Sequence, residues 1–113
     1  MDLTPLQIDV LRALLRSRVD GSSQYLSLSD LRDLMGKGAP DVQALSAALP
    51  ELSDWFRNHG LPDVTAVVIP SENADRNVML PDDSAVERLG GLAAAHAEAN
   101  RVRDFDWIGW RDG

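Results

Sequence analysis

The chain has 113 residues, which is enough for one domain with its own hydrophobic core and too few for two. Hydrophobic residues make up 44% of the chain and charged residues 26%, a composition typical of a globular protein and not of a disordered one. With no cysteine and only two histidines, disulfides and thiol catalysis are excluded, and we expect no cofactor and no metal; the net charge is −7.

The beginning of the chain, "MDLTPLQ", lacks the basic and apolar regions of a signal peptide. No stretch approaches the roughly 18 to 20 consecutive apolar residues that a membrane span requires. We therefore expect a cytoplasmic protein with a single domain over residues 1–113.

A capping box predicts the first helix. Thr4 can cap it, Pro5 suits its first position, and Gln7 can bind back to the backbone of Thr4. The apolar residues that then share one helical face are Leu6, Val10, Ala13 and Leu14. We expect this helix to be mostly buried, with a narrow polar stripe.

Loop residues follow from Asp20 to Gln24, and the alternation in "YLSLS" then indicates a short strand. Ser29 is positioned to cap a second helix that runs to Met35. The glycines at 36 and 38 end that helix.

Pro40 opens a predicted third helix, and Gly60 ends it. Pro50 lies within the apolar pattern, so we expect a kink or a restart there. The apolar residues are Val42, Leu45, Ala48 and Leu49 before the proline, and Leu52, Trp55 and Phe56 after it. This helix would be the recognition helix of a winged helix.

The β-branched segment Val64 to Ile69 predicts a strand. The segment "NVML" (77–80) can return beside it across Ser71 to Arg76, which predicts a β-hairpin. Three helices followed by a hairpin indicate an α+β, winged-helix-like fold.

Ser84 and Glu87 form a second capping box, which predicts a C-terminal helix to about Arg101. The aromatic tail beyond it contains Phe105, Trp107 and Trp110. We expect the tail to close over the core; exposed tryptophans would instead mark an interface.

One group of motifs carries a family resemblance. It comprises Leu49-Pro50-Glu51-Leu52, Trp55-Phe56, Gly60-Leu61-Pro62, Val64-Thr65, Val67-Val68 and Phe105-Asp106-Trp107. Over roughly residues 25–110 the chain resembles small uncharacterised bacterial proteins that carry an "LPPLTxLVV" strand, a glycine-rich turn and a terminal Phe-Asp-Trp. Those proteins are in turn similar to the winged-helix half of methylated-DNA cysteine methyltransferases. The resemblance implies a winged-helix fold.

The chain departs from that pattern at the residues that carry chemistry. Without cysteine, alkyl transfer is impossible, and no catalytic role passes to Ser71 or Glu72. The glycine-rich turn is replaced by the polar segment 71–76. We therefore expect a protein that is not an enzyme.

A winged-helix fold would make direct DNA binding an alternative function. The third helix would enter the major groove, and its contacts would be Gln43 and Arg57, with Arg76 on the wing. Because this region is mostly acidic, DNA would be repelled. A DNA-binding regulator or alkyltransferase-like lesion sensor is therefore the less favoured interpretation.

Residues 61–87 carry a net charge of −5. The acidic residues are Asp63, Glu72, Asp75, Asp82, Asp83 and Glu87, with Arg76 as the only cation. This run is either a solvated surface or an array of carboxylates that imitates phosphates and binds a basic protein surface, such as that of a nucleic-acid-binding complex. The second interpretation predicts a small acidic inhibitor of the phage or mobile-element anti-defence type, such as an anti-CRISPR protein, or else an antitoxin or immunity protein. The oligomeric state stays open.

Overall fold

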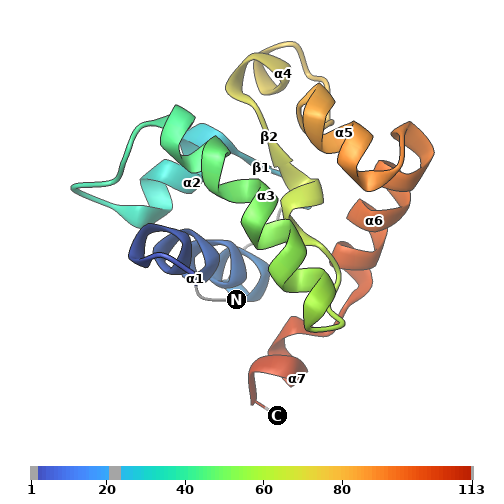
Figure 1. Cartoon of the computed structure of the whole chain (residues 1–113), viewed down its shortest axis with the longest axis horizontal. Helices are drawn as coiled ribbons and strands as arrows, with labels where there is room; N and C mark the ends of the chain where they lie inside the picture. The colour runs from blue at the N-terminus through green and yellow to red at the C-terminus, as the bar shows by residue number, and fades with distance from the viewer. Residues whose placement is uncertain (1–2, 21–23, 113) are drawn as a thin grey trace.

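The computed structural model describes residues 3–20 and 24–112, so most of the loop expected at 20–24 lies outside the described residues. The described part is mainly helical (Figure 1). Its elements are α1 (Pro5–Asp20), β1 (Leu26–Ser27), α2 (Leu28–Met35), α3 (Val42–Asn58), the 3-10 helix η1 (Val64–Val67), β2 (Val68–Ile69), α4 (Ser71–Asp75), α5 (Asp83–Leu89), α6 (Leu92–Asp104) and α7 (Trp107–Asp112). None of the described helices is long and apolar enough to cross a membrane.

The capping box at the start of α1 is confirmed. The Thr4 backbone N–H donates to Gln7 Oε1 over 2.9 Å, and the Gln7 N–H donates to Thr4 Oγ1 over 3.2 Å. On the apolar face of α1, Val10 and Leu14 are fully buried, and the helix packs against α2 and α3. The polar stripe of α1 is thereby left on the surface.

The next two helices begin at residues other than those expected. Ser27, and not Ser29, caps α2 by accepting a hydrogen bond from the Asp30 N–H over 3.1 Å. Asp41 caps α3 through the Ala44 N–H over 2.9 Å. Pro50 lies inside an unbroken α3, because the buried face continues on both sides of it and the proline itself is exposed.

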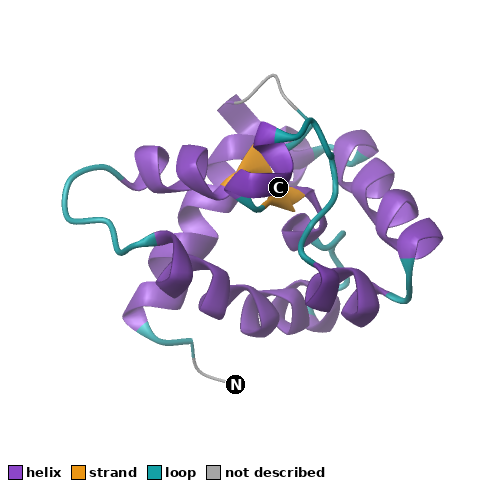
Figure 2. Cartoon of the chain, turned by 90° about the horizontal axis from the view of Figure 1, so that it is seen from above, coloured by secondary structure: helices purple, strands orange, loops and turns teal. Residues whose placement is uncertain are grey.

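The expected β-hairpin is wrong. Val64–Val67 form the 3-10 helix, and only Val68 and Ile69 are extended. They pair in parallel with β1, Leu26 opposite Val68, and the two short strands lie among the helices (Figure 2). Residues 61–69 are all buried, and η1 packs between α3 and α6. The segment 61–69 therefore lies wholly inside the protein. A strand of a surface hairpin would instead have one exposed face.

The expected return strand is also wrong, because the chain turns into α4. Asn77 adopts the left-handed conformation, with φ of 59°, just after this helix. Its N–H donates to the Ala74 carbonyl over 3.0 Å, and the Val78 N–H donates to the Asn73 carbonyl over 2.7 Å. These two bonds form a Schellman motif, a helix ending that directs the chain away from β2. With neither wing nor hairpin among the described residues, the winged-helix-like α+β assignment is incorrect.

The single helix expected from Ser84 to about Arg101 is divided in two. Asp82 caps α5 by accepting from the Ala85 N–H over 2.8 Å. The helix then ends at Gly90, whose φ of 107° is accessible to few residues other than glycine. Two consecutive glycines thus separate α5 from α6.

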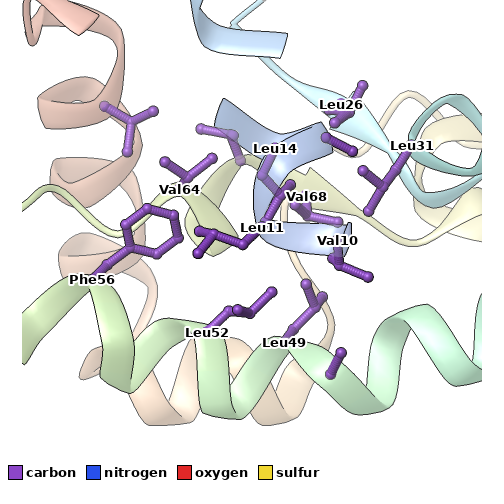
Figure 3. Packing of buried hydrophobic residues seen from close by; sticks show 14 of the residues in the cluster. Val10, Leu11, Leu14, Leu26, Leu31, Leu49, Leu52, Phe56, Val64 and Val68 are labelled. Carbon is purple, nitrogen blue, oxygen red and sulfur yellow. The ribbon is translucent and has the colours of Figure 1, made fainter. Parts of the chain in front are cut away.

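One cluster of buried side chains runs from Val10 in α1 to Trp107 in α7. Figure 3 shows Leu52 and Phe56 of α3 facing Leu11 and Val64 within it. Trp107 is buried, and its Nε1–H donates to the Val102 carbonyl over 2.8 Å. Trp110 is 40% exposed, so the expectation of a packed tail is confirmed for Trp107 and is wrong for Trp110.

Candidate functional site: the acidic surface of α4 and α5

Four of the six predicted acidic residues are exposed on two consecutive helices. Glu72 and Asp75 lie on α4, and Asp83 and Glu87 lie on α5. All four side chains are exposed, and the two helices lie next to each other at the top of Figure 1. We call these four residues the acidic surface.

Asp63 does not belong to this surface, because its side chain is only 2% exposed. One carboxylate oxygen accepts a hydrogen bond from the Ser53 hydroxyl. The other accepts from the Thr65 backbone N–H over 3.0 Å and from the Thr65 hydroxyl over 2.5 Å. Glu98 binds the Asp63 backbone N–H over 2.8 Å. Asp63 therefore holds η1 against α3 and α6, and a partner protein cannot reach it.

Asp82 has a mainly structural role as the cap of α5, and its side chain is half-buried. It also lines a small cleft with Glu72, Gln43 and Ser71, with a volume of about 250 Å³. The Ser71 hydroxyl lies 2.7 Å from that of Ser29 and ties α4 to α2. The cleft brings Gln43, predicted as a nucleic-acid contact, beside two of the predicted carboxylates.

Two apolar residues of this region were missed by the sequence reasoning, which had placed them in a strand. Val78 and Met79 are 36% and 38% exposed between α4 and α5. The Asn73 side chain donates to the Leu80 carbonyl over 3.0 Å and pins this segment. Asn77 was the signal in the sequence that a helix ends here, because asparagine often adopts the left-handed conformation just after a helix. Exposed apolar residues and exposed carboxylates on neighbouring segments are the residue types found in an interface core and rim.

The alternative nucleic-acid contacts do not gather on one surface. Gln43 and Arg57 are separated by about 20 Å along α3, given the rise of an α-helix. Arg57 is moreover paired with Asp54, with 2.5 Å between Nη2 and Oδ1. Arg76 is exposed at the end of α4. The three residues offer no continuous phosphate-binding surface.

No catalytic constellation accompanies the acidic surface within the described residues. Ser71 is hydrogen-bonded to another serine and not to a histidine base. The described His, Asp and Glu residues form no group of three that could hold a metal ion. Among the described carboxyl groups, the pKa of the exposed Asp104 on α6 is clearly lowered, through a hydrogen bond from Arg103. What this surface can provide is negative charge and apolar contact.

Comparison with protein-family models, with curated proteins and with solved structures finds no match to this chain. The resemblance to small bacterial winged-helix-like proteins therefore stays an untested prediction, although the fold that it implied is wrong.

Proposed function

We propose that this chain is a non-catalytic binding protein whose acidic surface attaches to a basic surface of a partner protein. The observation that supports the proposal is the exposure of Glu72, Asp75, Asp83 and Glu87 on two helices that are joined by the segment with the exposed Val78 and Met79. Complementary charge accelerates encounter and selects the partner, and the exposed apolar residues contribute affinity.

A basic protein is a better fit than nucleic acid because both the net charge of −7 and the acidic surface repel polyanions. Carboxylates displayed in this way can occupy a site that normally receives phosphates. The specific form of the proposal is a cytoplasmic inhibitor of a nucleic-acid-binding complex, of the phage or mobile-element anti-defence type such as an anti-CRISPR protein. An antitoxin or immunity protein would use the same surface on another target.

The test compares the natural chain with a variant that combines Glu72→Gln, Asp75→Asn, Asp83→Asn and Glu87→Gln. Asp63 and Asp82 are left unchanged because both stabilise the fold. Each immobilised protein is exposed to a cell extract, and binding of the retained protein is then measured by calorimetry. Loss of four charge pairs is expected to weaken binding by about 1–4 kcal/mol, which is roughly fivefold to several hundredfold.

The matched control combines Asp30→Asn, Asp33→Asn, Glu51→Gln and Asp104→Asn, four exposed carboxylates outside the acidic surface. It changes the net charge by the same amount, so it separates the effect of the acidic surface on binding from the effect of net charge. Equal binding by the natural chain and both variants would contradict the proposal.

Duplex DNA provides a second test. We expect no binding of the natural chain to a labelled random duplex at about 50 mM salt, where phosphate contacts are strongest. Binding that weakens steeply with added salt would instead identify nucleic acid as the partner.

A further inference from the structure

Five of the described arginines are held by their own chain. Arg57, Arg101 and Arg103 pair with nearby carboxylates. The Arg18 and Arg32 side chains donate to backbone carbonyls. These five are therefore partly engaged before any partner arrives.

Arg12, Arg16 and Lys37 differ from those arginines. All three are exposed, and none forms an ion pair within the part of the chain that the structure describes. They line one cleft of about 630 Å³ between α1 and the loop at residues 36–40, and Asp9 is the one carboxylate among its described lining residues. We call this the basic cleft. Three cations in one cleft are notable in a chain whose net charge is −7.

Apolar side chains also line the basic cleft. Leu6, Ala13 and Met35 are partly or fully buried, and Leu34 is 39% exposed. Beyond Arg16 a second cleft of about 330 Å³ continues between α1 and α7, where Trp110 is exposed. Arginine and tryptophan are the residue types most enriched at interface hot spots.

The loop that carries Lys37 is held in place. Arg32 Nε donates to the Pro40 carbonyl over 3.1 Å, and the Ala39 N–H donates to the Gly36 carbonyl over 3.2 Å. Gly36 and Gly38 both have left-handed φ values, 81° and 82°, which shape the turn. A cleft whose wall is already ordered loses little entropy when it is filled.

We propose that the basic cleft binds an acidic amphipathic peptide segment of a partner protein. Apolar residues of such a segment would contact Leu34 and its neighbours, and its carboxylates would pair with Arg12, Arg16 and Lys37. The cleft volume of about 630 Å³ is that of pockets that bury a drug-sized ligand, so a few side chains of the segment would enter the cleft. In Figure 1 α1 lies at the lower left and α7 at the bottom, whereas α4 and α5 lie at the top and upper right, so this site is separate from the acidic surface.

Peptide is favoured over nucleic acid by the character of the cleft. Single-stranded nucleic acids bind through successive aromatic stacking platforms, whereas the side chains beside the cations of this cleft are aliphatic. A long polyanion would also meet the negative charge of the rest of the chain. A short segment experiences chiefly the local field, since charges are screened beyond about 10 Å at 0.1 M salt.

The probe is a labelled peptide of about 12 residues with leucine at helical spacing i, i+3, i+4 and i+7 and glutamate elsewhere. Binding to the full chain is followed by fluorescence anisotropy at about 50 mM salt and by amide chemical shifts in NMR. We expect shifts concentrated at residues 9–16 and 34–39. Combining Arg12→Gln, Arg16→Gln and Lys37→Gln should weaken binding by about tenfold or more.

The matched control combines Arg57→Gln, Arg101→Gln and Arg103→Gln, which removes the same charge elsewhere and should change binding by less than about twofold. Leu34→Ser should also weaken peptide binding, and a single-stranded oligonucleotide of equal length should bind more weakly than the peptide. The proposal is overturned by absence of shifts at about 1 mM peptide, by equal effects of the two triple variants, or by tighter binding of the oligonucleotide. None of these outcomes bears on the acidic surface.

Discussion

At the scale of single residues, Asp63 is the acidic residue whose role differs most from its expected one. Counted along the chain it belongs to the acidic run, but in space its carboxylate accepts hydrogen bonds from Ser53 and Thr65 inside the protein. A buried carboxylate is tolerated only when it is well supplied with donors. Asp63 is therefore a residue of the fold and not of the binding surface.

We predict that Asp63→Ala lowers the free energy of unfolding by about 2–4 kcal/mol, because the Ser53 hydroxyl and the Thr65 N–H lose their buried acceptor. Urea denaturation measures this change. Asp75→Ala, at an exposed position, is the control and should change stability by less than about 0.5 kcal/mol. Similar values for the two variants would contradict the structural role of Asp63.

At the scale of elements, the way in which α4 ends prevents the β-hairpin that the sequence predicted. The β-branched residues from Val64 to Ile69 favour a strand in isolation, but a short buried apolar run has no periodicity that separates a strand from a helix. The polar segment from Ser71 to Asp75 then forms a helical turn, and Asn77 ends it in the left-handed conformation. Val78 and Met79 are left on the surface as a result.

Substitution of Asn77 distinguishes the observed helix ending from the return strand that the sequence predicted. We expect Asn77→Val to lower the free energy of unfolding by about 1–2 kcal/mol, because a β-branched side chain is strained at a φ of 59°. Asn77→Gly should be nearly neutral. Thermal denaturation checks both variants. A return strand would give the opposite order, since valine favours strands and glycine weakens them.

At the scale of the whole molecule, the buried cluster joins side chains from α1 to α7. The expectation of one domain over residues 1–113 predicts that this cluster is lost in a single step. Phe56→Ala removes a fully buried ring from it and should lower the free energy of unfolding by about 3–5 kcal/mol.

The measurement follows urea unfolding of the natural chain and of Phe56→Ala by far-ultraviolet circular dichroism and by tryptophan fluorescence. Two of the three tryptophans, Trp107 and Trp110, lie in α7, so the fluorescence signal is weighted toward the C-terminal part of the chain. Coincident transitions that shift together in the variant are expected. Separate transitions would show that the C-terminal helices unfold independently.

The sequence by itself determined those features that depend on neighbours within about four residues. Thr4 and Gln7 specify the start of α1, and the apolar spacing of Val10 and Leu14 specifies its buried face. The formal charge and the lack of cysteine are likewise properties of composition alone.

Tertiary structure alone decided which distant residues meet. It paired Leu26 with Val68 in parallel, buried Asp63 and exposed Met79. It also brought Lys37 beside Arg12 and Arg16. The physical reason is that burial and proximity depend on how the helices pack against one another. Whether a segment forms a helix or a strand then depends on the space in the packed interior as well as on its local preference.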